Sequence, residues 1–202
     1  MYSKMIDYES VKEENKQYEE ILGLKEEFPD LKFSPPCNVI ARTQNDIYES
    51  FTIDKGSRDG IKIHDPVITK SGLVGIISEV ELTYSKVTTI LSPEYPIGVY
   101  CVETKEPGYI QGTYDIAKDG LCSMKGISLD SSIKIGDIIV TSGNSELAPK
   151  ERMIGTISEV TTDKGGLTLN AKIKPIVDIS QVKNVFVITA FEGQGQGVGN
   201  DK

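Results

Sequence analysis

The sequence lacks most of the residues and motifs that enzymes use for chemistry. It contains no tryptophan and a single histidine, His64. It has no C-x-x-C pair, no H-E-x-x-H motif, no EF-hand loop and no Walker sequence, which are the usual signatures of zinc, calcium and nucleotide-phosphate sites. We therefore expect neither a metal ion nor a cofactor.

Long hydrophobic runs are also missing. No stretch approaches the roughly 20 apolar residues that a membrane-spanning helix needs. The first residues, Met-Tyr-Ser-Lys, do not resemble a signal peptide. Either the protein is cytoplasmic or the chain begins after a membrane anchor.

Cysteine is scarce and unpatterned. Cys37, Cys101 and Cys122 are an odd number without a repeating spacing, which is typical of neither a disulfide framework nor a zinc site. One pair could still form a bridge. Cys101 lies in an alternating apolar run, 99–102, so we expect it to be a small buried side chain.

Positive charge is in deficit, with a net charge of −8 at pH 7. A nucleic-acid backbone or an anionic membrane surface would repel such a protein. Neither is expected as its main partner.

The stretch 51–80 carries the densest structural signals. Alternating apolar residues are separated by Gly56, Gly60 and Gly72, which predicts short strands joined by tight turns. Valine, isoleucine and threonine are frequent from residue 39 to residue 191, as pleated strands prefer. The fold should therefore be mainly β.

Part of this stretch is repeated. Residues 61–69 (IKIHDPVIT) match residues 133–141 (IKIGDIIVT) at a shift of 72 (133 minus 61), and residues 75–80 match residues 155–160 at a shift of 80 (155 minus 75). The additional residues fall in 142–150, where a loop tolerates an insertion. Two copies indicate two similar β units. The residues expected to form the structural turn motif are Gly56, Gly60, Gly72, Gly75, Gly136, Asp137, Gly143 and Gly155.

Each unit contains six predicted strands without a helical stretch between them. In the first unit they are 38–43, 48–54, 66–69, 73–80, 86–91 and 97–103. In the second they are 108–114, 121–125, 137–141, 153–161, 167–174 and 184–190. Barrel closure removes exposed strand edges. The sequence therefore predicts two six-stranded antiparallel β-barrels in a chymotrypsin-like arrangement, preceded by a coiled-coil helix.

The expected domain division follows from these elements. It places a helix at 1–28, a proline-bearing linker at 29–36, the first β-barrel unit at 37–106, the second at 107–191 and a tail at 192–202. The tail is rich in glycine and glutamine, which predicts disorder.

Residues 2–28 are rich in glutamate and lysine and precede a proline, which is typical of a helix. Tyr8, Val11, Asn15, Tyr18 and Leu22 are spaced by 3, 4, 3 and 4 residues, as the a and d positions of a heptad repeat are. We call these five residues the seam. Such a narrow seam suits a partner helix, so we expect a homodimeric coiled coil with Asn15 fixing its register. The alternative is a single amphipathic helix folded back on the β units.

A chymotrypsin-like hydrolase would need a histidine and an acid, and His64 stands beside Asp65. However, Gly136 takes the place of His64 in the second repeat. A position that glycine and histidine share is typical of a turn at positive φ. Ser71 and Ser142 lie in neither a G-x-S-x-G nor a G-D-S-G-G setting. The sequence therefore favours a protein that is not an enzyme.

Several motifs follow one another between Tyr8 and Ile188. They are ILGL at 21–24, VIAR at 39–42, FTIDKGSRDGI at 51–61, DPVIT at 65–69, SGLVG at 71–75, KV at 86–87, LSP at 91–93 and GDIIVTSG at 136–143. In this order they resemble the MreC family of rod shape-determining proteins. The family usually continues with a Gly-rich turn and F-P-x-G, whereas residues 144–152 replace that pattern here and keep only Pro149-Lys150.

The resemblance implies a non-enzymatic scaffold of the bacterial cell-elongation machinery. Family members have a membrane helix, a coiled coil and two β-barrels outside the membrane. They dimerise through the coil, self-associate further through the barrels, and bind penicillin-binding proteins and other membrane components of the machinery. The chain would then lie on the extracytoplasmic face of the bacterial membrane, with one preceding helix as its anchor. The alternatives are a chymotrypsin-like hydrolase and a cytoplasmic ligand-binding barrel.

Overall fold

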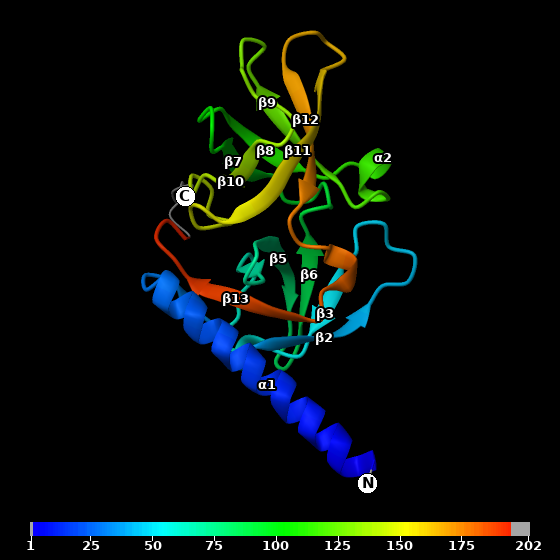
Figure 1. Cartoon of the computed structure of the whole chain (residues 1–202), viewed down its shortest axis with the longest axis vertical. Coiled ribbons are helices and arrows are strands. Elements are labelled where there is room, and N and C mark those ends of the chain that lie inside the picture. The colour runs from blue at the N-terminus through cyan, green and yellow to red at the C-terminus, as the bar shows by residue number, and fades with distance from the viewer. Residues whose placement is uncertain (1, 195–202) are drawn as a thin grey trace, which may run out of the picture.

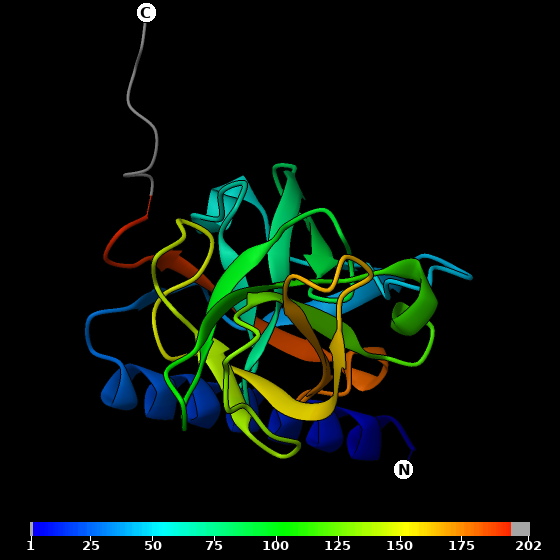
Figure 2. The ribbon, with the colours of Figure 1, turned by 90° about the horizontal axis from the view of Figure 1, so that it is seen from above.

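The computed structural model describes residues 2–194, with side chains from residue 11 onward (Figures 1 and 2). One long helix, α1 (Tyr2–Glu27), precedes two β-barrels. It ends just before Pro29, whose missing backbone N–H cannot continue a helix. Within these residues, no helix combines the length and the apolar character that crossing a membrane requires.

Both barrels are closed, six-stranded and antiparallel, which confirms the predicted fold class. The first contains β2 (Cys37–Arg42), β3 (Phe51–Ile53), β4 (Pro66–Ile68), β5 (Leu73–Val80), β6 (Ser85–Thr89) and β13 (Asn184–Ala190). The second contains β7 (Ile97–Cys101), β8 (Pro107–Gln111), β9 (Cys122–Ile127), β10 (Ile138–Thr141), β11 (Met153–Thr162) and β12 (Leu169–Pro175). The shorter elements are β1 (Lys32–Phe33), η1 (Ser57–Asp59), α2 (Tyr114–Ala117) and η2 (Ile179–Gln181).

Two strands belong to the opposite barrel from the one that the sequence predicts. β7 is expected in the first unit and β13 in the second, but β13 closes the first barrel against β4, and β7 closes the second against β10. Phe186 of β13 lies opposite Ile68 of β4. The predicted boundary between 106 and 107 is therefore wrong. Apolar alternation locates a strand but not its partner, because pairing depends on packing between distant segments.

The predicted linker and the start of the predicted tail are more ordered than expected. The linker contains β1, which pairs with β13, and the Ser34 backbone N–H donates to the Val187 oxygen at 2.8 Å. Residues 192–194 form a turn, from which the Gln194 amide donates to the Asp65 carboxylate at 2.7 Å. The rest of the predicted tail, 195–202, lies outside the described residues.

The internal repeat forms the same turn in both barrels. His64 has a φ of 73° and Gly136 a φ of 95°. Their backbone N–H groups donate to the oxygens of Ile77 and Ile157, each at 2.8 Å. The prediction that His64 is a turn residue at positive φ is confirmed.

The following aspartate closes each of these turns. The Asp65 carboxylate accepts the backbone N–H of Lys62, and the Asp137 carboxylate accepts that of Lys134, both at 2.8 Å. The two segments thus share side-chain contacts as well as sequence, which supports a duplicated β unit.

The residues predicted to form the turn motif fall into two groups. Those that lie in or next to turns or bends are Gly56, Gly60, Gly72, Gly136, Asp137 and Gly143. Gly75 and Gly155 instead lie inside β5 and β11, so their assignment to turns is wrong. A Cβ on Gly75 would collide with the backbone oxygen of Thr88. A Cβ on Gly155 would collide with the backbone oxygen of Lys174 in the same way. The close approach of the neighbouring strand therefore requires glycine at both positions.

Candidate interaction surfaces

Helix α1 contacts the first barrel through one narrow face. Gln17, Ile21 and Leu24 are spaced by four and three residues and are only 8%, 4% and 2% exposed. The Gln17 amide donates to Asn38 Oδ1 at 3.3 Å. Figure 1 shows α1 running diagonally past β13 and β2, with its first turns extending beyond the barrel. Our sequence reasoning missed this face, although the helical spacing of its residues was a usable signal.

The seam lies on another face of α1. Successive helix residues are rotated by about 100°, so Leu22 points well away from the direction of the barrel-facing Ile21. Val11, Tyr18 and Leu22 are 53%, 48% and 59% exposed, and Asn15 is exposed. The Tyr8 side chain lies outside the described side chains. The helix does fold back on the first barrel, but it leaves the described part of the seam uncovered.

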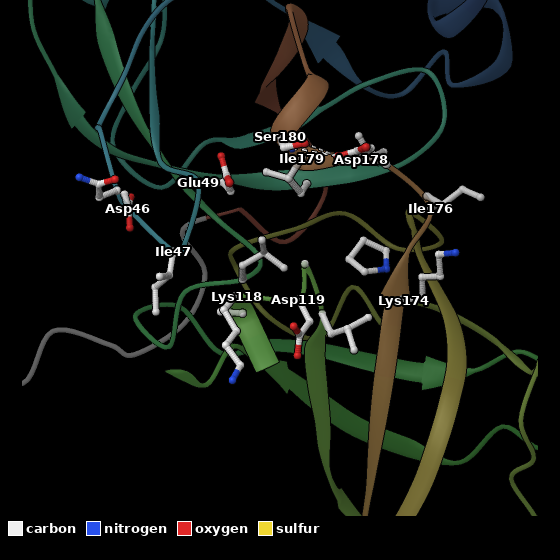
Figure 3. A pocket seen from close by; sticks show the side chains of 17 residues that line it. Asp46, Ile47, Glu49, Lys118, Asp119, Lys174, Ile176, Asp178, Ile179 and Ser180 are labelled. Atoms are coloured by element: carbon white, nitrogen blue, oxygen red, sulfur yellow. Dashed lines mark hydrogen bonds between the residues drawn. The ribbon is translucent and has the colours of Figure 1, made fainter. Parts of the chain in front are cut away.

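A groove of about 840 Å³ lies between the two barrels (Figure 3). Its walls come from residues 45–49 of the first barrel, from residues 117–121 at the end of α2 in the second, and from the end of β12 with the crossover 176–180 that leads to β13. Leu91, Val177 and Ile179 form a buried apolar floor, at most 9% exposed, beside the half-exposed Ile176. The volume lies in the range typical of ligand-binding clefts, about 300–1,000 Å³.

The rim of the groove is charged and carries more acid than base. Its ionisable residues are Asp46, Glu49, Asp119, Asp178, Lys118 and Lys174. Figure 3 shows Asp46 and Glu49 on the first-barrel side of the groove, and Lys118 and Asp119 on the second-barrel side with their side chains directed away from the first barrel. An apolar floor inside a mainly acidic rim distinguishes this groove from a plain seam between two domains.

Arg42 holds one wall of the groove in place. Its guanidinium donates to the backbone oxygens of Ile179 at 3.0 Å and Val182 at 2.7 Å. It also lies 3.6 Å from the Glu49 carboxylate. Because Ile179 and Glu49 both line the groove, Arg42 ties the crossover to the loop of the first barrel.

The Asp46 carboxylate is held in its charged form. Partial burial raises the pKa of Asp46, but the carboxylate accepts the backbone N–H groups of Tyr48 and Ser50, each at 3.0 Å. These hydrogen bonds outweigh burial and hold the pKa below its ordinary value. The rim therefore carries this negative charge at neutral pH.

His64 and Asp65 do not form the histidine–acid pair of a hydrolase. The His64 ring lies edge-on to Tyr95, with centroids 5.5 Å apart. The Asp65 carboxylate is hydrogen-bonded to Lys62 and to Gln194, and burial raises its pKa. The acid that would have to orient the histidine is thus committed to the turn and to the C-terminal segment.

The identity of the chain follows from comparison with known proteins. Residues 39–189, which contain nearly all of both barrels, match the family described as "Rod shape-determining protein MreC, barrel core". This chain belongs to the MreC family. The resemblance based on motif order is therefore confirmed.

Curated relatives agree with this assignment. The chain is 35% identical over 182 residues to the cell shape-determining protein MreC of Listeria monocytogenes, covering 88% of this chain and 60% of the relative. It is 29% identical over 190 residues to MreC of Bacillus subtilis, covering 89% and 64%. The chain thus spans less than two thirds of the length of either relative.

Solved MreC structures share the fold. A structure of MreC from Listeria monocytogenes superposes with a TM-score of 0.72 at 29% identity, covering 96% of this chain and 95% of that one. A chain in the complex between penicillin-binding protein PBP2 and MreC from Helicobacter pylori gives a TM-score of 0.62 at 13% identity, covering 79% and 99%. At 13% identity, the second likeness concerns the fold alone.

The loop 142–152 contains a residue in the left-handed conformation. Glu151 has a φ of 65°, a conformation that glycine adopts more easily.

The next residue links this loop to the end of α1. Arg152 is 7% exposed, and its guanidinium carbon lies 3.4 Å from the centre of the Phe28 ring. Burial lowers the pKa of Arg152, and among the described residues its Nε has no hydrogen-bond partner. The stacked cation and ring tie the second barrel to the end of the helix.

All three cysteines are free and buried, so the optional bridge is not formed and Cys101 is buried as predicted. Burial raises the pKa of Cys37 and of Cys122 to about 12, which keeps both as unreactive thiols. Cys101 Sγ lies 3.4 Å from Glu103 and 3.6 Å from Asp137. Both carboxylates also accept backbone N–H groups, so this cluster is part of the hydrogen bonding of the fold.

Proposed function

We propose that this MreC chain is the extracytoplasmic part of a non-enzymatic scaffold of the bacterial cell-elongation machinery. It pairs with a second copy through α1 and organises cell-wall synthases with its barrels. The observation that carries the proposal is the division of α1 into two faces. The face with Ile21 and Leu24 is used by the chain's own barrel, whereas Val11, Tyr18 and Leu22 remain exposed at heptad spacing.

The division has a physical consequence for pairing. An exposed apolar seam favours association because burial of its side chains releases them from water, at about 25 cal/mol per Å² of apolar surface. Since the seam and the barrel-facing side diverge by about 100°, two helices could pair without displacing either barrel. Asn15 within the seam would select the register of the pair.

The scaffold would act by holding its partner proteins in place. Two barrel pairs held on one coil face nearby partners at a high effective concentration, so weak individual contacts become sufficient. A penicillin-binding protein is the partner that we propose first, with other membrane components of the machinery beside it. Support comes from the Helicobacter pylori complex, in which MreC is bound to PBP2. We place the chain outside the membrane behind a single N-terminal anchor helix, as the family resemblance implies.

Light scattering tests the pairing. Leu22→Asp should weaken self-association by about a hundredfold or more, ~3 kcal/mol, because it puts a carboxylate into an apolar interface. Asn15→Leu should strengthen association or change the number of paired helices, since it removes the polar register residue.

The matched control is Leu82→Asp. Leu82 is the same residue type, is 66% exposed, and lies in a turn of the first barrel. It should leave the association state unchanged. A protein that is monomeric at high concentration, and that stays so in both seam variants, would refute pairing through the seam.

A further inference from the structure

We propose that the groove between the barrels binds a segment of a partner protein in which apolar side chains alternate with lysine or arginine. This inference rests on the scaffold function proposed above and names the chemistry that one of its surfaces recognises. It is carried by the floor, the rim and the position of the groove.

The floor offers apolar contact without needing any change in the fold. Val177 and Ile179 of the crossover are 9% and 4% exposed, and both line the groove together with Leu121. Ile47 faces the groove from the first barrel, whereas the exposed side chain of Ile176 points away from Ile47, with its Cγ2 beside Gly72. Apolar side chains that are already ordered can receive a partner at low entropic cost.

The rim selects the charge of the partner. Four carboxylates stand against two lysines and Arg42, which pairs with Glu49, so acid remains in slight excess, and the whole chain carries a net charge of −8. Asp119 is exposed at the mouth, and the hydrogen bonds of Asp46 keep its charge in place. An acidic segment would be repelled, whereas a basic one would be attracted and oriented.

The position of the groove explains why a scaffold would use it. Leu91 lies in the first connection between the barrels, and residues 176–180 belong to the second. Both connections therefore border the same groove, and neither barrel alone contains it. A bound segment would contact both barrels and hold their relative orientation, so partner binding and barrel geometry would be coupled.

The test uses fluorescence anisotropy with the whole chain and a short labelled peptide of alternating leucine and lysine. Comparison peptides carry glutamate in place of lysine, or serine in place of leucine. Ile47→Glu should weaken binding of the leucine–lysine peptide by about tenfold, the effect of losing one apolar anchor. Asp119→Lys should weaken it by about threefold, with an effect that shrinks as salt is raised.

Each groove variant has a control of the same chemistry elsewhere. Ile135→Glu alters an isoleucine that is 70% exposed on the second barrel, and Asp130→Lys changes the net charge as Asp119→Lys does. Both controls should change binding by less than about twofold. Asp119 is exposed, so Asp119→Lys still tests the proposal if Ile47→Glu fails to fold.

Three results would overturn the proposal: no binding of the leucine–lysine peptide, equal binding of the glutamate peptide, or equal losses in groove and control variants. The scaffold function can be judged separately, with a penicillin-binding protein ectodomain and by light scattering. If the chain dimerises and binds that ectodomain regardless of Ile47→Glu, the scaffold function stands and the groove inference is wrong.

Discussion

The two barrels have the same arrangement of strands but different routes to closure. Around the second barrel the strands follow the cyclic order β10-β11-β12-β9-β8-β7, and around the first the order is β4-β5-β6-β3-β2-β13. Position by position, β13 therefore takes in the first barrel the place that β7 takes in the second. The second barrel is built from one continuous segment, whereas the first barrel is closed by β13, which follows the second barrel in the sequence.

This difference shows how one β unit can occur twice in one chain. The turn of His64 and that of Gly136, with their aspartates, keep the same geometry in both copies. Only the closing strand changes its origin. Because β13 follows the second barrel, the first barrel is complete only after the chain has passed through the second, and the two are joined by two connections instead of one.

Removal of β13 should produce the largest difference between the two barrels. Deletion of residues 184–202 removes Val185, Phe186, Val187 and Ile188, each at most 1% exposed. Each such side chain contributes about 1.5–3 kcal/mol, and their sum approaches the about 5–15 kcal/mol stability of a whole domain. Hydrogen exchange should show loss of protection across 37–89 and retained protection across 97–175.

Deletion of residues 195–202 alone is the control, and it should leave protection unchanged in both barrels. Amides of 37–89 that stay protected without β13 would show that the first barrel does not depend on its distant strand.

Matched glycine substitutions would compare the stability of the two barrels at equivalent positions. Gly75→Ala and Gly155→Ala each place a Cβ against the backbone of the neighbouring strand and should lower the free energy of unfolding by about 1–3 kcal/mol. Urea unfolding measures both. Gly23→Ala is the control, because nothing lies within 4 Å of its Cβ position in α1, and it should stabilise by about 1 kcal/mol. If only one strand glycine proved sensitive, the barrels would not be equivalent there.

The loop that lengthens the second barrel provides a smaller test. Glu151→Gly should raise the free energy of unfolding by about 1 kcal/mol, because it relieves a non-glycine residue at a φ of 65°. The corresponding residue of the first barrel is Ser71 (151 minus 80), whose φ is not positive. The neighbouring Lys150→Gly should instead be neutral or destabilising in the same urea titration. Equal effects of both would argue against strain at residue 151.

At the shared turn, replacement of His64 should give the smallest effect. His64→Gly relieves a φ of 73° but loses the edge-on contact with Tyr95, worth about 0.5–1.5 kcal/mol, so its stability should be nearly unchanged. Gly136→Ala, at a φ of 95°, should lower stability by about 1–2 kcal/mol. Partner binding should survive His64→Gly. A hydrolytic activity that disappeared with His64 would instead favour the hydrolase alternative.

Local sequence signals were sufficient for much of the fold. Glycine at position 136 and histidine at the equivalent position 64 of the repeat predicted a positive φ, because few residues accept that conformation. The heptad spacing of Val11, Tyr18 and Leu22 predicted an apolar stripe, and these side chains are exposed on one side of α1. Whether that stripe pairs with another copy stays a prediction.

Other features could not be read from nearby residues. Gly75 looks like a turn residue in the sequence, yet it lies inside β5, where the backbone of Thr88 leaves no room for a side chain. Arg42 forms part of a recognisable motif, but its role became visible only from its bonds to Ile179 and Val182, which lie far along the chain.

The sequence by itself determined the presence of the helix, the turns and most strands, because each depends on residues that are close along the chain. Tertiary structure alone decided which strand closes each barrel, which face of α1 meets its own barrel, and where the groove opens. The reason is separation: Val187 lies opposite Val67, 120 residues away (187 minus 67), and such a pairing is selected by the packing of the whole first barrel.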